Sequence, residues 1–155
     1  MAKYCPAFLV TVAVAIVAAT ACGKEETCSV HPDAFRFSIV EAGTGTDLLR
    51  SGVYDPGSIG IWYFYNDDRN DLIVNREANP DGDLIELVSV QLPMISLTGR
   101  SDIFYLALNE EDTDTLTVVV ERESRDGCDY HPYTMVKHNG NALPITEGKS
   151  FIIEK

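Results

Sequence analysis

Apolar residues recur at every second position in several short runs of this chain, and turn-forming residues separate the runs. In Phe35–Val40, two phenylalanines and Ile39 fall on one side, as they would on one face of a β-strand. The run Ile59–Tyr65 is rich in aromatic and β-branched residues and apolar on both faces, which predicts a central strand. Gly43–Gly45 and Tyr54–Gly57 carry the glycine and proline residues of tight turns. The pattern therefore predicts an all-β fold.

The rest of the chain repeats this arrangement, and no window shows the periodicity of a helix. Stretches rich in asparagine and aspartate at Asn66–Asn70 and Asn79–Asp83 predict loops. Further strands are predicted at Leu72–Val74, Asp83–Leu92, Asp102–Leu108, Thr115–Arg122, Thr134–Lys137 and Ser150–Ile153. Short strands at this spacing favour an antiparallel β-sandwich of about seven to nine strands, transthyretin-like or immunoglobulin-like, with an open barrel as the alternative.

The amino terminus has the layout of a secretory signal peptide. Lys3 precedes the apolar run Pro6–Ala21, which ends in small residues just before Cys22. The run is shorter than the roughly 20 residues that a helix needs to cross a bilayer, so a permanent span is disfavoured. We expect residues 1–21 to be a signal peptide, 22–33 a flexible tether and 34–155 a single β-sandwich domain.

The residues around Cys22 resemble two export signals. Ala19-Thr20-Ala21-Cys22 resembles a lipobox, which implies that Cys22 is acylated and becomes the first mature residue; an ordinary cleaved signal with an incidental cysteine is the alternative. Cys22 is followed by Gly23, Lys24, Glu25 and Glu26, which resembles the surface-export signal of Bacteroidota lipoproteins. That resemblance implies a lipid-anchored protein on the outer face of the outer membrane. The periplasmic face is the alternative.

The chain is strongly acidic. It has 24 Asp and Glu against 12 Lys and Arg, and its formal charge changes from −12 to −13 when Lys3 leaves with the signal peptide. Such a surface repels phosphate backbones and anionic lipid head groups. We therefore expect no nucleic-acid partner, and we expect membrane attachment to rest on the acyl chains. The remaining partner classes are glycans and envelope proteins.

Two cysteines, Cys28 and Cys128, remain after cleavage and acylation. An even pair in an exported protein predicts a disulfide. Both cysteines begin a Cys-x-x-His-Pro pattern, so a zinc site formed by Cys28, His31, Cys128 and His131 is the rival interpretation, and free thiols are a third. The disulfide is favoured because the compartment is oxidising. No cofactor is expected.

The polar residues have ordinary interpretations. His138 stands beside Asn139-Gly140 and is predicted to be a solvated turn histidine. Four aspartates could meet around calcium, but aspartate is also a common turn former, which is the favoured interpretation. They are Asp81, Asp83, Asp112 and Asp114. Asp114-Thr115-Leu116 resembles the O-glycosylation sequon of exported Bacteroidota proteins, which implies a glycan on Thr115.

The aromatic residues of the central run could form a platform for stacking sugars, but they divide between two strand faces, which favours the core. They are Trp62, Tyr63, Phe64 and Tyr65. No catalytic motif stands out: neither Gly-x-Ser-x-Gly nor His-Glu-x-x-His occurs. We expect a non-enzymatic structural or binding accessory, with a glycan-binding module as the alternative and a small extracytoplasmic hydrolase as the third.

Residues 34–155 also resemble a group of small Bacteroidota lipoproteins for which no activity is known. The matching features are Thr44-Gly45-Thr46-Asp47-Leu48-Leu49, Tyr54–Ile59, Asp112–Leu116, Cys128 and Asn139-Gly140. This resemblance implies the localisation and a sandwich fold. It implies no catalytic residues.

Overall fold

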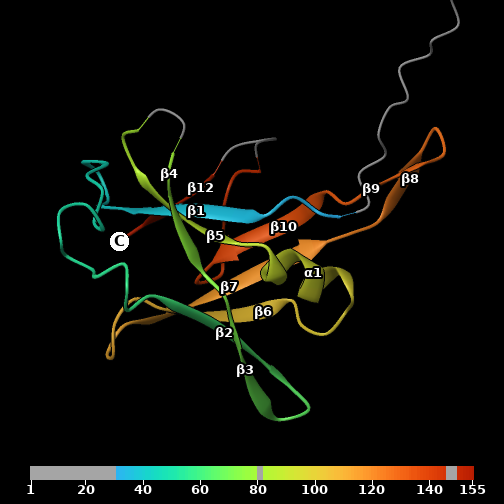
Figure 1. Cartoon of the computed structure of the whole chain (residues 1–155), viewed down its shortest axis with the longest axis horizontal. Helices are drawn as coiled ribbons and strands as arrows, with labels where there is room; N and C mark the ends of the chain where they lie inside the picture. Colours follow the sequence, from blue (N-terminus) through green and yellow to red (C-terminus); the bar gives the residue numbers. More distant parts are fainter. Residues whose placement is uncertain (1–30, 80–81, 146–149) are drawn as a thin grey trace, which may run out of the picture.

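The computed structural model describes residues 31–79, 82–145 and 150–155. They form two main β-sheets packed face to face, with a short helix at one side (Figure 1). The predicted all-β sandwich is confirmed. Several predictions lie outside the described residues: the signal peptide, the acylation site Cys22, the export signal Lys24, Glu25 and Glu26, and Cys28.

The smaller sheet has four strands in the order β12-β1-β5-β4. These are β12 (Phe151–Glu154), β1 (Phe35–Val40), β5 (Ile85–Ser89) and β4 (Asn75–Ala78). β1 pairs in parallel with β12, with Phe37 opposite Phe151, and antiparallel with β5. The first and last strands of the described chain are therefore neighbours.

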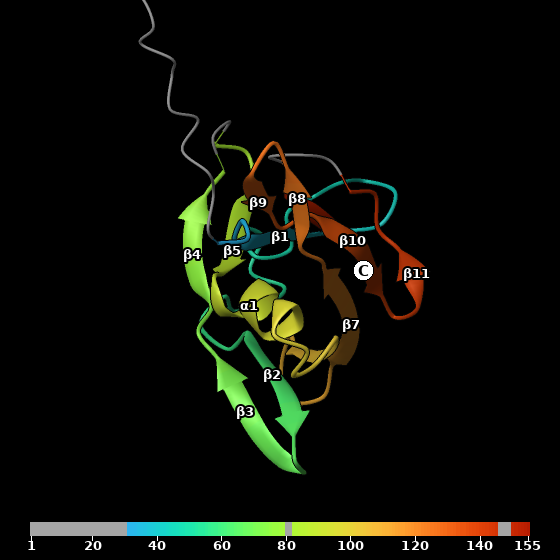
Figure 2. The same ribbon diagram turned by 90° about the vertical axis from the view of Figure 1, so that its right-hand side faces the viewer.

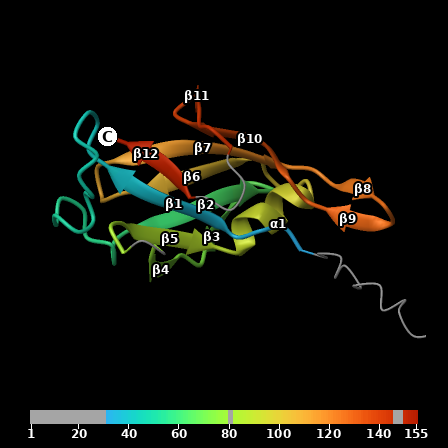
Figure 3. The same ribbon diagram turned by 90° about the horizontal axis from the view of Figure 1, so that it is seen from above.

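The larger sheet has six strands in the order β11-β10-β7-β6-β2-β3, all paired antiparallel. These are β11 (Asn141–Ala142), β10 (Tyr133–His138), β7 (Thr113–Val120), β6 (Ile103–Ala107), β2 (Gly60–Tyr65) and β3 (Asp68–Leu72). A separate hairpin of β8 (Glu123–Arg125) and β9 (Cys128–Tyr130) projects from one end of the sandwich (Figure 3). The β2–β3 hairpin extends past the helix (Figure 2).

The core lies between the two sheets. Along β7 every second residue is buried, and Leu116 and Val118 are fully buried, as the two-residue period of a strand requires. On the opposite sheet, the Phe35 ring lies 5.0 Å from the Phe151 ring and 5.6 Å from the Phe37 ring, measured between ring centroids. The aromatic residues of the first predicted strand thus anchor the smaller sheet.

The described residues contain twelve strands rather than about seven to nine, because polar segments also pair. In the stretch Asn66–Asn70, predicted as a loop, the first two residues form a turn and the other three begin β3. Asn66 and Asp67 have φ angles of 53° and 68°. Positive φ at both positions is the geometry of tight hairpin turns, which asparagine and aspartate tolerate. The turn closes the β2–β3 hairpin.

The structure corrects the prediction that the chain has no helix. The predicted strand Asp83–Leu92 ends at Ser89, and α1 (Gln91–Leu97) follows. Pro93 is acceptable in α1 because it occupies the first turn, where backbone N–H groups have no partner within the helix. Leu92 and Pro93 are buried, so packing against the sheets stabilises the helix.

Gly99 ends α1 and permits a sharp change of direction. Its φ is +68°, its N–H donates to the Ser96 carbonyl at 2.8 Å, and the Arg100 N–H donates to the Ile95 carbonyl at 3.1 Å. These two bonds and the positive φ are a Schellman motif. The motif determines where Arg100 emerges from the helix.

Gly99→Ala should lower the free energy of unfolding by about 1 kcal/mol, since a Cβ disfavours positive φ. A Cβ at this position would meet no atom within 4 Å, so the cost comes from the backbone alone. Urea denaturation measures it. Gly60→Ala is the control, because Gly60 has the same open surroundings without the positive φ. Equal losses in the two variants would contradict the argument.

Candidate functional site

The outer face of the six-stranded sheet carries exposed apolar side chains. Phe64 on β2 is 49% exposed and Ile103 on β6 is 51% exposed. Half-buried Trp62 and Tyr105 lie opposite each other on the same two strands, and Met135 on β10 adds a further exposed side chain. We call these five residues the outer apolar face.

The prediction that the central aromatic run belongs to the core is therefore wrong for part of it. Tyr63 is buried, whereas Phe64 and Tyr65 are exposed and Trp62 is half-buried. β2 is flanked by β3 and β6, so it is an interior strand as predicted. Its outer face is left uncovered because the second sheet packs on its other face.

The rings of the outer apolar face are packed against one another. The Trp62 and Tyr105 ring planes are 16° apart, with centroids separated by 5.8 Å. From the other side, the Arg69 guanidinium carbon lies 4.1 Å from the Trp62 centroid, and Arg69 donates two hydrogen bonds to Asp71. Because β3 and β6 flank β2 on opposite sides, Trp62 has Arg69 as a neighbour on one side and Tyr105 on the other.

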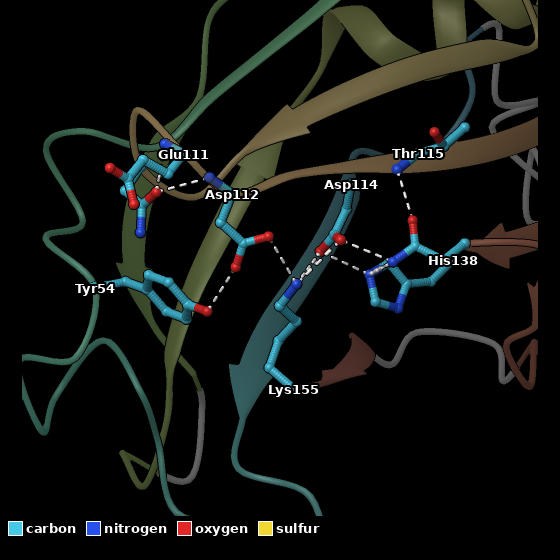
Figure 4. Close-up of polar contacts among 9 residues, drawn as sticks. Tyr54, Glu111, Asp112, Asp114, Thr115, His138 and Lys155 are labelled. Carbon is cyan, nitrogen blue, oxygen red and sulfur yellow. Dashed lines mark hydrogen bonds and ion pairs between the residues drawn. The ribbon is translucent and has the colours of Figure 1, made fainter.

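A group of polar side chains lies where β12 ends and β7 begins (Figure 4). We call it the interior polar cluster. It consists of Tyr54, Asp112, Asp114, His138 and Lys155. Asp114 on β7 is 4% exposed and accepts hydrogen bonds from Lys155 Nζ at 2.9 Å and Asn139 Nδ2 at 2.7 Å.

The Lys155 ammonium joins the two sheets. Lys155 follows β12 of the smaller sheet, and its Nζ lies 3.0 Å from Asp112 Oδ1, next to β7 of the larger sheet. Asp112 in turn accepts a hydrogen bond from the Tyr54 hydroxyl at 2.9 Å. The two carboxylates therefore hold a cation that belongs to the chain itself.

His138 is not the solvated turn residue that was predicted. It is 9% exposed, and its Nε2 lies 2.9 Å from Asp114 Oδ2. β10 continues past the end of the predicted strand to include His138. His138 is two residues after buried Val136, so both side chains lie on the same face of the strand. That phase is a sequence signal that points His138 inward, but only the pairing of β7 with β10 shows that Asp114 is its partner.

The protonation states of the cluster favour a structural role. Burial raises the pKa of Asp114, but the hydrogen bonds from Asn139, His138 and Lys155 outweigh it, and the pKa lies below its ordinary value. Burial lowers the pKa of Lys155, but the hydrogen bonds to Asp114 and Asp112 raise it by more. The pKa of Lys155 therefore lies above its ordinary value. An ionised carboxylate and a charged ammonium form a stable pair, whereas a general base or nucleophile needs a pKa near the working pH.

The calcium alternative is not supported by the geometry. Asp112 and Asp114 do meet, but around Lys155 Nζ, while Asp83 is exposed and Asp81 lies outside the described residues. Within residues 31–79, 82–145 and 150–155, no three metal-ligating side chains come together.

Cys128 is buried in β9, on the projecting hairpin. His31 is exposed, and His131 is half-buried with a buried Nδ1 that has no hydrogen-bond partner in the described part of the chain. Cys28 lies outside the described residues, so the disulfide and the zinc site both stay predictions.

Thr115 is half-buried in β7 and lies opposite Tyr105. Its predicted glycosylation also stays a prediction. The preceding residue of the sequon, Asp114, is held in the interior polar cluster by hydrogen bonds from Asn139 and Lys155. In the folded domain its carboxylate is therefore not accessible to a glycosylating enzyme.

Comparison of this chain with protein-family models, with curated proteins and with solved structures finds no match. In the described part of the chain, no helix is long and apolar enough to cross a bilayer.

Proposed function

We propose that this protein is a lipid-anchored lipoprotein of the outer membrane, displayed at the cell surface, that acts without catalysis by binding another envelope protein. The export signals around Cys22 support the anchoring and the display. The outer apolar face is the observation that supports the binding. It lies on a regular sheet, so its residues are held in fixed positions.

The composition of this face suits a protein partner. Exposed apolar patches on soluble domains commonly mark interaction sites, and aromatic residues and methionine are enriched in interface cores. Polar residues adjoin these side chains: Thr117 on β7 lies opposite Ile103, and Lys137 on β10 lies opposite Thr117. An apolar centre with a polar rim is the usual anatomy of a protein interface.

The charges favour a different protein over a second copy of this chain. The mature chain has a formal charge of −13, and like charges disfavour self-association. On the face itself, Arg69 is paired with Asp71, and Lys137 adds a positive charge. The face is thus less acidic than the rest of the molecule, and it suits a neutral or weakly acidic partner.

The Arg69 guanidinium lies 4.1 Å from the Trp62 centroid, so it occupies one face of that ring and leaves less aromatic surface for stacking a sugar. A hydrolase would need a nucleophile beside His138. Among the described residues, the hydrogen-bonding partners of His138 are Asp114 and Asn139.

A photo-crosslinking residue placed at Ile103 in the full chain, expressed in a Bacteroidota host, should give an adduct with one envelope protein. The matched control is Ile152, which is 40% exposed on β12 of the other sheet.

In binding assays with the identified partner, Phe64→Ser should weaken the complex about tenfold or more, because exposed aromatic residues are frequent hot spots.

Intact mass of the same purified chain reports the acyl group on Cys22, and protease treatment of whole cells reports surface display. No adduct from Ile103, or equal adducts from Ile103 and Ile152, would overturn the proposed interface. A chain without acyl mass would overturn the anchoring.

A further inference from the structure

A groove of about 420 Å³ lies between the β2–β3 hairpin and α1, on the opposite side of the hairpin from the outer apolar face. Figures 1 and 2 show the hairpin extending past the helix. The hairpin contributes Tyr63, Asn70 and Leu72 to the lining, and the helix with its C-terminal turn contributes Gln91, Met94 and Arg100. The groove is largely open to solvent rather than enclosed.

Several polar side chains in the groove are held in one orientation by a hydrogen bond and still have unused hydrogen-bonding atoms. Gln91 Oε1 accepts the Ile73 N–H at 2.7 Å, and Asn70 Nδ2 donates to the Asp68 carbonyl at 2.8 Å. Within the described residues, Gln91 Nε2 and Asn70 Oδ1 have no hydrogen-bond partner, and neither has the Tyr63 hydroxyl. One anchored end sets the direction of the free end.

Arg100 adds a guanidinium to the same groove. It emerges from the Schellman turn at Gly99, and its Cζ lies 5.8 Å from the centroid of the Tyr65 ring. In the described part of the chain, this guanidinium has neither an ion pair nor a hydrogen bond. All five of its donors are therefore available to a ligand.

The apolar part of the lining comes from Leu72, Val90, Met94 and Ile95. Planar amides and a guanidinium can bond two adjacent hydroxyl groups at once, while apolar side chains pack on C–H groups. A sugar presents both surfaces together. A carboxylated sugar fits less well, because the chain carries a high negative charge.

We infer that this groove binds a neutral oligosaccharide. Arg100, Gln91 and Asn70 bond its hydroxyl groups, Tyr63 donates or accepts a further bond, and Met94 packs against a ring. This site is independent of the proposed protein interface.

The test is calorimetric titration of the full chain with cellohexaose, maltohexaose, laminarihexaose, xylohexaose and mannohexaose. At least one should bind, and Arg100→Ala should weaken that binding about tenfold or more, the effect of losing a hydrogen bond to a charged group. Tyr63→Phe should weaken it severalfold while leaving the melting temperature unchanged. Tyr105→Phe on the outer face is the matched control and should bind as the parent does.

Absence of binding by all five sugars would overturn the inference. It would also be overturned if Arg100→Ala and Tyr63→Phe bound normally while Phe64→Ser did not, since the sugar would then lie on the outer face. Because Phe64→Ser should leave sugar binding intact, failure of the groove and failure of the protein interface are distinguishable.

Discussion

Phe35→Ala should lower the free energy of unfolding by about 3 to 5 kcal/mol. The Phe35 side chain has no exposed surface, and its ring is packed against the rings of Phe37, Phe151 and Tyr133. Removing it leaves a cavity among groups from β1, β10 and β12, which the paired strands are not free to fill. Since small domains are stable by about 5 to 15 kcal/mol, this loss is a large share of the total.

Urea denaturation followed by fluorescence measures this difference. Phe64→Ala is the matched control, because the same atoms are removed from a side chain that is 49% exposed. We expect the control to change stability by less than about 1 kcal/mol, since exposed positions away from special features are tolerant. Similar losses in the two variants would contradict the assignment of Phe64 to a solvent-facing surface.

Asp114→Ala should cost about 3 to 5 kcal/mol, because it removes one partner of a buried ion pair. The carboxylate accepts bonds from Lys155 and Asn139 and contacts His138, so three polar groups lose a partner together. Asp112→Ala is the comparison. Its side chain is more exposed, and we expect a smaller loss of about 1 kcal/mol.

The Asp114 contribution should depend on pH in a defined direction. Its pKa is lowered on folding, so the unfolded chain takes up the proton first as the pH falls. The stabilisation is complete above the ordinary value near 3.8, and it is lost as the pH falls through the lower folded value. The difference between the parent and Asp114→Ala should therefore shrink in acid. A difference that stays constant from neutral pH to strong acid would contradict this assignment.

Local sequence patterns predicted the strands well where one face is buried and apolar. The predicted strands at Phe35–Val40, Asp102–Leu108 and Thr134–Lys137 each overlap an observed strand closely. The polar strands β3 and β4 were missed because their residues show no apolar alternation, and neighbouring strands supply the pairing that makes them regular. Helix α1 was missed because seven residues show too little periodicity.

The candidate sites depended on contacts between distant residues. Alternation divided Trp62 and Tyr63 between two faces, but it did not show which face the second sheet covers. His138 and Asp114 are 24 positions apart, and the groove combines the β2–β3 hairpin with the end of α1. No local signal joins these segments.

The sequence by itself determined the all-β class, the two-faced strands and the acidic charge, because these follow from residue types and a period of two. The tertiary structure alone decided that Phe64 faces solvent, that Lys155 bridges Asp112 and Asp114, and that Arg100 reaches a groove beside Tyr63. The physical reason is that strand order and sheet packing are set by the summed burial of the whole core, and they bring together residues that do not interact along the chain.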